Sequence, residues 1–261
     1  MTAAELPLRR GRGWIVPVVT VVAWQMLVET GVLAFRFLPA PDQVARAVLQ
    51  VVRSGALAAD LLHTTAITVL AAMIALALGG VLGLGFGLLP RLRRNAMASV
   101  DVLRTIPAVA LMPIALLTFG PVPSTELMLA VWAAQWPVVV STAAGVRNVP
   151  DRLYDVARML QLSRTATIRK IVIPAVVPSW LAGARLATII ALHVTITAEM
   201  VMAPAGLGGA LVQAMQALNV ERMWAYAVVC GIVGASANAG LRRLVAAALP
   251  GSPVDRSVGA R

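Results

Sequence analysis

Charged residues and cysteine are scarce in this sequence. Asp, Glu, Lys and Arg make up 13% of its 261 residues, and 59% are hydrophobic, whereas soluble domains carry roughly 25% charged residues. A soluble chain of this length needs more polar residues to cover its surface, and a disordered chain has far less to bury. The single cysteine, Cys230, allows neither an intrachain disulfide nor a cysteine metal site. The composition therefore predicts an all-α, polytopic membrane protein.

Catalytic motifs are also missing. The sequence contains no G-x-x-x-x-G-K-[ST] phosphate-binding loop, no H-E-x-x-H and no paired metal ligands. We therefore expect no catalytic, cofactor-binding or metal-ligating residue in this chain, and an intramembrane enzyme has no catalytic constellation to support it. The net charge of +11 does not indicate nucleic-acid binding, because the basic residues lie between apolar runs rather than on a soluble basic domain.

Six apolar runs approach the length of about 20 residues that crosses a bilayer. The first run follows three arginines, as the core of a secretory signal would. It is longer than the roughly 7 to 15 residues of such a core, and no A-x-A-like site follows it. We therefore expect six membrane-spanning helices, the first of them retained. The runs cover residues 14–35, 66–89, 100–119, 127–146, 176–202 and 223–244.

The basic residues are distributed unevenly between the two sides of such a bundle. If the N-terminus is cytoplasmic, 16 of the 22 Lys and Arg residues fall in cytoplasmic segments and four in external segments. Loops rich in Lys and Arg stay in the cytoplasm, so both termini are predicted to be cytoplasmic. The predicted organisation is an N-terminal segment with the first helix (1–35), an external loop with an amphipathic helix (36–65), a core (66–250) and a cytoplasmic tail (251–261).

The predicted cytoplasmic loop at residues 147–174 is too long for a simple turn. Pro150 and Asp151 are typical of a helix start, because proline fits the first turn and a negative charge suits the positive end of the helix dipole. An apolar stripe follows at helical spacing, and a second short helix is expected at 163–173. Two interpretations stay open: an amphipathic hairpin on the membrane surface, or a docking element for a soluble partner. The stripe consists of Leu153, Val156, Ala157 and Leu160.

At this loop the sequence resembles a known family. The letters YDVARMLQLSR at 154–164, followed by IVIP at 171–174, resemble the EAA loop of permease subunits of bacterial ABC importers. Other stretches resemble the nitrate, sulfonate and taurine group of these permeases, in the same order and spacing. They are LPAP at 38–41 with RSG at 53–55, RTIPAVALMP at 104–113, GVRNVP at 145–150, GARLA at 183–187, and AEM at 198–200 with GLG at 206–208.

The loop departs from the family pattern at three positions. Asp155 stands where the pattern has Glu, which keeps the charge, and Val156 replaces the first Ala. Gln161 stands where the family has a glycine between two short helices. A left-handed backbone at Gln161 costs more than at glycine, so either the residue accepts that cost or the bend forms differently.

The resemblance implies a mechanism and a set of partners. Two permease copies, usually identical in this group, form a pathway across the bacterial inner membrane, and an external binding protein delivers a small anion, a sulfonate, taurine, nitrate or a vitamin precursor. A dimer of cytoplasmic ABC ATPases binds ATP and Mg²⁺, so this chain needs no cofactor of its own. The EAA helix docks in a groove of the ATPase. The ATPase-coupling residues are then Leu153, Asp155, Val156, Ala157, Leu160 and Gln161.

Polar and small residues inside the apolar runs are further candidates. Ionisable groups within a membrane span are functional candidates by default, so His193, Thr197 and Glu199 are a tentative pathway wall. A buried histidine with one hydrogen-bond partner is the simpler interpretation of His193, and Glu199 could lie at the membrane interface. Gly79, Gly83 and Gly87 recur every fourth residue and suit close helix packing in lipid, within one subunit rather than between two.

A stand-alone channel or secondary transporter is the alternative function. Such a protein needs no cytoplasmic docking loop, and the sequence shows no duplicated halves of the kind that inverted repeats produce. The sequence therefore favours the permease of an importer, and transport without ATP would support the alternative.

Overall fold

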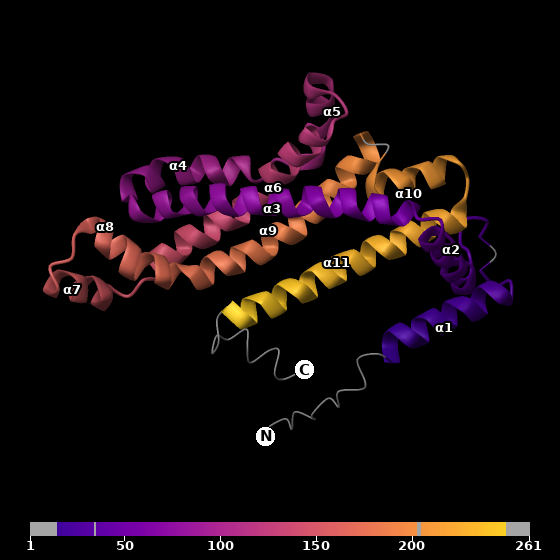
Figure 1. The fold of residues 1–261 in the computed structure, drawn as a ribbon, viewed down its shortest axis with the longest axis horizontal. Helices are drawn as coiled ribbons and strands as arrows, with labels where there is room; N and C mark the ends of the chain where they lie inside the picture. The colour runs from indigo at the N-terminus through magenta and orange to yellow at the C-terminus, as the bar shows by residue number, and fades with distance from the viewer. Residues whose placement is uncertain (1–14, 34, 203–204, 249–261) are drawn as a thin grey trace.

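The computed structural model describes residues 15–33, 35–202 and 205–248, which form helices with no strand among them. The molecule is an elongated bundle in which α3, α6 and α9 run side by side (Figure 1). A π-helical turn, Ile168–Val172, joins α8 to α9. The helices are α1 (Ile15–Glu29), α2 (Pro41–Arg53), α3 (Ala56–Leu88), α4 (Pro90–Leu103), α5 (Ala108–Phe119), α6 (Pro123–Arg147), α7 (Asp151–Met159), α8 (Arg164–Thr167), α9 (Ile173–Met202), α10 (Gly206–Gln216) and α11 (Val220–Ala248).

Small residues let the three central helices approach closely. The core between them consists largely of fully buried alanines, and small side chains bring helix backbones together in a medium that offers no hydrophobic drive. These alanines are Ala71, Ala75, Ala130, Ala134, Ala187, Ala191 and Ala198.

The predicted glycine stripe of α3 faces α6. A Cβ atom added at any of the three positions would collide with a side chain of α6, and these partners themselves recur every fourth residue. The stripe and its partners are therefore complementary surfaces within one chain. The pairs, with the distance from the added Cβ to the partner's Cβ, are Gly79 with Val138 at 2.7 Å, Gly83 with Thr142 at 2.6 Å, and Gly87 with Val146 at 2.5 Å.

Four helical runs are long and apolar enough to cross a membrane: α3, α6, the run Arg164–Met202 that includes α9, and Val220–Ala247 in α11. Helices α4 and α5 qualify only together, with a bend of 82° between them. The described residues therefore provide four spans, or five if the bent pair is one span. Helix α1 has 15 residues and is shorter than a span, so the count of six stays a prediction.

Two of the expected spans differ from the observed helices. The expected third span, 100–119, is broken before α5 at Pro107, which has no N–H to donate and disfavours a helical conformation in the residue before it. Helix α3 begins at Ala56 rather than at residue 66, directly after Gly55, whose φ is 76°. The predicted external loop is therefore shorter than expected, and much of it is helix.

The amphipathic helix expected within 36–65 is α2, and its apolar face packs on protein. Val44, Ala47 and Val51 are buried, and Val51 belongs to a cluster with Leu207 and Tyr226 from α10 and α11. On the outer face Arg46 forms an ion pair with Asp42. Helix α2 therefore packs on the end of the bundle that carries α10, rather than lying on a membrane surface without protein contacts.

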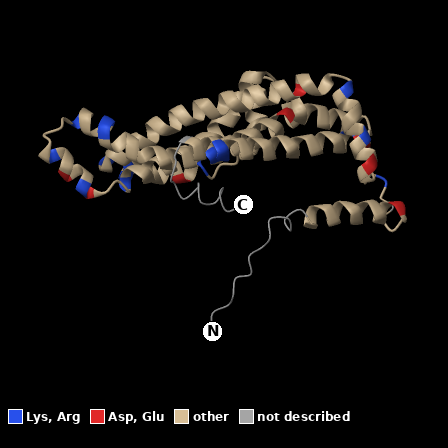
Figure 2. Cartoon of the chain, turned by 60° about the horizontal axis from the view of Figure 1, so that its bottom comes forward, with Lys and Arg blue, Asp and Glu red and all other residues tan. Residues whose placement is uncertain are grey.

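The basic side chains gather at the other end of the bundle. Figure 2 shows Lys and Arg concentrated around α7 and α8, where five basic residues are exposed. They are Arg152, Arg158, Arg164, Arg169 and Lys170.

Candidate functional site

The loop between α6 and α9 folds into two short helices with a tight turn between them. Pro150 precedes α7 in an extended conformation and Asp151 occupies its first turn, as the sequence predicts. After the turn, the hydroxyl of Ser163 accepts a hydrogen bond from the amide of Ala166 at 3.2 Å and so caps α8. The loop projects from one end of the bundle (Figure 1).

The turn depends on Gln161, whose φ is 48°. The Gln161 amide donates to the carbonyl of Arg158 at 3.0 Å, and the Leu162 amide donates to the carbonyl of Ala157 at 3.0 Å. These two bonds make the Schellman arrangement, in which a left-handed residue ends a helix. Of the two outcomes open for Gln161, the structure has the left-handed one, at a cost of about 1–2 kcal/mol relative to glycine.

The apolar stripe of α7 is divided between two surfaces. Ala157 is buried, and Leu153 packs with Tyr154 against a small core formed by valines of α6, α9 and the segments next to them. In contrast, Val156 and Leu160 are exposed, by 45% and 65%. Helical spacing predicts that all four residues share one broad face, but it does not show that half of this face is occupied by the protein itself.

Met159 completes the outward part of the stripe and was missed by the sequence reasoning. Its side chain is 83% exposed, beside Val156 and Leu160 in the last turn of α7. We call Val156, Met159 and Leu160 the outer patch. Asp155 forms an ion pair with Arg158 next to it, and both are exposed. The loop thus presents a small apolar surface within a mainly basic rim, the composition expected of a helix that binds a groove.

The tentative pathway residues differ in their exposure. His193 is exposed, and Thr197, one turn later, donates its hydroxyl to the His193 carbonyl at 2.7 Å. Glu199 is fully buried within the bundle. His193 is therefore not a buried histidine in this chain, and Glu199 does not lie at an exposed interface.

Glu199 fastens α10 to the central helices. Its Oε1 accepts a hydrogen bond from the Thr64 hydroxyl at 2.7 Å, and its Oε2 accepts one from the Gly208 amide at 2.9 Å. The Thr64 hydroxyl in turn accepts from the Leu207 amide at 2.9 Å. A carboxylate at the start of α10 also suits the positive end of that helix dipole.

Glycine is required at Gly206, where α10 begins. Its φ is 87°, and an added Cβ would overlap the Glu199 carboxylate. The backbone of Gly206 therefore has to approach the acid closely in a conformation that other residues adopt at a cost. The AEM and GLG stretches of the sequence thus form one structural unit.

Two more titratable groups lie at this unit: the Nε2 atom of His63 is 3.1 Å from Oε2 of Glu126. Sequence reasoning missed His63, Thr64 and Glu126, because their connection to Glu199 joins three helices far apart in the chain. The one local signal was the adjacent pair His63 and Thr64 on a run otherwise rich in apolar residues.

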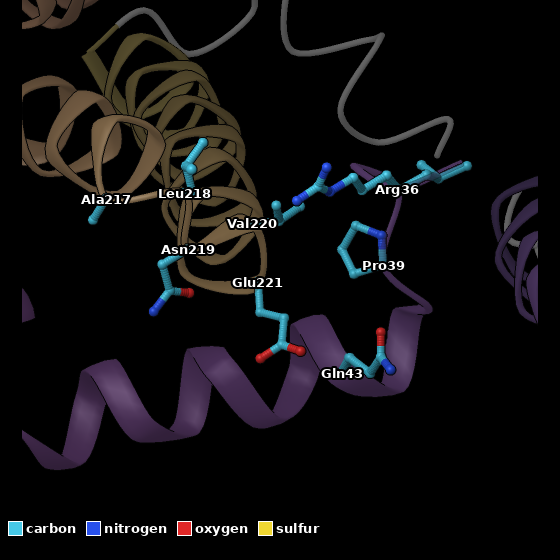
Figure 3. A pocket seen from close by; sticks show the side chains of 9 residues that line it. Arg36, Pro39, Gln43, Ala217, Leu218, Asn219, Val220 and Glu221 are labelled. Carbon is cyan, nitrogen blue, oxygen red and sulfur yellow. The ribbon is translucent and has the colours of Figure 1, made fainter. Parts of the chain in front are cut away.

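A polar hollow of about 570 Å³ opens at the same end of the bundle. Figure 3 shows Arg36 and Gln43 on the side of α2, facing Asn219 and Glu221 beside the start of α11. Leu218, between α10 and α11, has φ 55°. This end therefore presents both positive and negative groups, whereas the α7 end is mainly basic.

Comparison with known proteins shows the family to which the chain belongs. Residues 75–250 match the family described as "Binding-protein-dependent transport system inner membrane component". The chain belongs to this family. It is 30% identical over 235 residues to the putative aliphatic sulfonates transport permease protein SsuC of Escherichia coli, covering 88% of each chain. It is also 38% identical over 143 residues to the nitrate import permease protein NrtB of Synechococcus elongatus, covering 53% of this chain and 48% of that one.

These relatives identify an ABC importer permease of the nitrate, sulfonate and taurine group. A solved structure of the inward-facing MetNI methionine ABC transporter contains a chain with the same fold, at a TM-score of 0.65 and 18% identity. The match covers 76% of the permease and 98% of that chain. The permease is thus an integral membrane subunit of a class that is generally non-catalytic.

Proposed function

We propose that this permease forms the translocation pathway of an ATP-driven importer as a homodimer, coupled through α7 to a pair of cytoplasmic ABC ATPases. The ATPases supply the sites for ATP and Mg²⁺. The observation that carries the proposal is the outer patch, Val156, Met159 and Leu160, held on a short exposed helix. Exposed apolar residues on a basic loop are costly in water and suit insertion into a partner groove.

The contacts of the loop would transmit a movement of α7 to α9. Leu153 packs the inner face of α7 against the core that includes Val172 and Val176, and Ala157 is buried. From α8 onward the chain continues as one helical run, Arg164–Met202, to the opposite end of the bundle. A shift of α7 imposed by an ATPase would therefore reach α9 directly.

Substitution of the outer patch tests this coupling. Leu160→Arg places a charge in the proposed groove while the residue stays exposed, so we expect loss of ATPase co-purification and of ATP-dependent uptake, with normal membrane insertion. The matched control is Leu49→Arg on α2, which is 55% exposed and lies at the other end of the bundle. Retention of the ATPase by Leu160→Arg would contradict the docking role of α7.

The orientation with both termini in the cytoplasm is part of the proposal. The exposed basic residues around α7 and α8 support it, because such residues mark the cytoplasmic side. The polar hollow at the opposite end would then face the external substrate-binding protein. Single cysteines at Thr165 and Asn219, placed in a Cys230→Ser background, should react with impermeant thiol reagents from opposite sides of the membrane. Labelling of both from one side would contradict this topology.

The substrate we propose is a small anion such as nitrate or a sulfonate, as the relatives' names suggest. A hollow of about 360 Å³ between α6 and α9 is lined by Arg104, Trp136 and Ser141 among others, and it offers a cation and a hydroxyl to such a solute. A stand-alone channel is not favoured by the comparisons. Uptake into liposomes by the permease alone, without an ATPase and ATP, would support that alternative and contradict the proposal.

A further inference from the structure

Three side chains with metal-ligating atoms converge at the end of the bundle that carries α10. His63 comes from α3, Glu126 from α6 and Glu199 from α9, and one ligand atom from each lies within 4.8 Å of the other two. The carboxylates are buried, with 2% and 0% of Glu126 and Glu199 exposed. The His63 side chain is 23% exposed, which leaves a route from the surface to the cluster.

The cluster holds two buried carboxylates and one imidazole. Among the described residues, His63 is the one basic group within ion-pair distance of either carboxylate. A protonated imidazole compensates one negative charge, so a second ionised carboxylate would have no counter-charge, which is costly in a buried place. A divalent cation would compensate both carboxylates while the imidazole remained neutral and able to bind it.

The ligand atoms suit a transition metal of the zinc class. Zn²⁺ binds imidazole nitrogen and carboxylate oxygen at about 2.0–2.2 Å, so adjacent ligands in a tetrahedral site are about 3.3 Å apart. The observed separation of His63 Nε2 and Glu126 Oε2 is 3.1 Å. Glu199 must approach the other two by a small movement of its side chain.

Hydrogen bonds already orient one ligand as outer groups do in metal sites. Each oxygen of Glu199 accepts one bond, from Thr64 or from Gly208, and each keeps a lone pair for a metal. Mg²⁺ demands octahedral oxygen coordination and retains its water, so a compact site with one nitrogen ligand discriminates against it.

Two buried hydroxyls without a partner in the described part of the chain occur one helical turn from the cluster, on two of the three helices that form it. Thr68 and Thr195 are 5% and 0% exposed, and their hydroxyls have no hydrogen-bond partner among the described residues. Thr68 lies one helical turn beyond Thr64, and Thr195 lies one turn before Glu199. Because α3 and α9 run in opposite directions (Figure 1), both residues are placed one helical turn deeper in the bundle than the contact between Thr64 and Glu199.

We propose that His63, Glu126 and Glu199 bind one divalent transition-metal ion, of which Zn²⁺ is the representative. The ion has three protein ligands and a fourth position open to water. It joins α3, α6 and α9 at the end away from α7, and through Glu199 it also holds α10.

The test uses the full-length permease in lipid nanodiscs, purified with a tag that contains no histidine and stripped with EDTA. Zn²⁺ titration by calorimetry should show about one strong site per chain, and the thermal midpoint should rise with Zn²⁺ but not with Mg²⁺. The chain has two histidines, which provide a matched pair. His63→Gln should weaken Zn²⁺ binding at least tenfold, and His193→Gln should leave it unchanged.

A second readout does not depend on the stability of the variants. With Cu²⁺ as the probe, pulsed EPR should detect one coordinating imidazole nitrogen, which His63→Gln removes and His193→Gln retains. Glu126→Gln should lower Zn²⁺ affinity in the same way if it folds. Equal Zn²⁺ binding by His63→Gln and the parent, absence of a strong site in the parent, or Mg²⁺ binding as tight as Zn²⁺ would overturn the proposal.

Discussion

The two ends of the helical run Arg164–Met202 are built on opposite principles. At the α7 end the outer patch is exposed: Met159 and Leu160 face outward, and Asp155 and Arg158 pair with each other in solvent. At the α10 end the polar groups are buried, and Glu199 has a hydrogen-bond partner for each of its oxygens. The contrast teaches that one helical run can join an exposed apolar surface beside one of its ends to a buried anchor at the other.

This difference predicts how substitutions at the two ends behave. Exposed groups contribute little to folding, and they affect binding where a partner covers them. A buried carboxylate that loses its hydrogen-bond donors destabilises the fold, and so do buried donors that lose the carboxylate. Substitutions at the α10 end should therefore lower stability, and those in the outer patch should lower coupling without lowering stability.

The largest effect is expected from Glu199→Ala. It leaves the Gly208 amide and the Thr64 hydroxyl without an acceptor in a buried place, so we expect a loss of about 3 kcal/mol from two unsatisfied buried donors. Thermal unfolding in nanodiscs measures this loss. The control is Met200→Ala, at the neighbouring and exposed position, and an equal effect in both variants would contradict the anchoring role of Glu199.

The glycine stripe gives the next effect. Gly83→Ala introduces a Cβ that would lie 2.6 Å from Thr142 Cβ and 2.7 Å from the Val139 carbonyl oxygen, and overpacking of this kind costs about 1–3 kcal/mol. Gly85→Ala is the matched control on the same helix, because a Cβ there meets nothing within 4 Å. It should be neutral, or stabilising by up to about 1 kcal/mol. A loss in Gly85→Ala as large as that in Gly83→Ala would contradict packing on α6 as the cause, because a Cβ at Gly85 meets nothing within 4 Å.

Local sequence signals predicted local structure well. Hydrophobic length located α6, α9 and α11, and Pro150 and Asp151 predicted where α7 begins, whereas the bend at Gln161 was expected from the family resemblance. Tertiary contacts could not be predicted from these local signals. Helical spacing placed Leu153 and Leu160 on one stripe without showing that only Leu160 is exposed.

The same limit explains why the partners of the buried polar residues were not predicted. Composition identified Glu199 as unusual, but its partners Thr64 and Glu126 come from helices that periodicity alone cannot place beside α9. His193 was equally conspicuous in the sequence and lies exposed on the bundle. A rare polar residue in an apolar run thus predicts importance without predicting its neighbours.

Ala157 separates stability from docking at the α7 end itself. Ala157→Arg forces a charged side chain into a position that is 4% exposed, so we expect a loss of about 2 kcal/mol together with loss of coupling. Leu160→Arg should lose coupling alone. Thermal unfolding combined with ATPase co-purification distinguishes the two variants. If Ala157→Arg were as stable as the parent, α7 would not be fixed by its inner face.

The smallest effect concerns the two left-handed residues, one at each end. Gln161 and Leu218 have φ values of 48° and 55°, and each ends a helix through the same pair of backbone hydrogen bonds. Glycine adopts this conformation without strain but loses more backbone entropy on folding, which offsets part of the gain. Gln161→Gly and Leu218→Gly should therefore each stabilise the permease by at most about 1 kcal/mol. Gln161→Gly should in addition change the ATPase rate of the assembled importer, because the turn sets the angle between α7 and α8, and Leu218→Gly should not. Equal effects of both variants on that rate would show that the α7 turn transmits no more than an ordinary helix end.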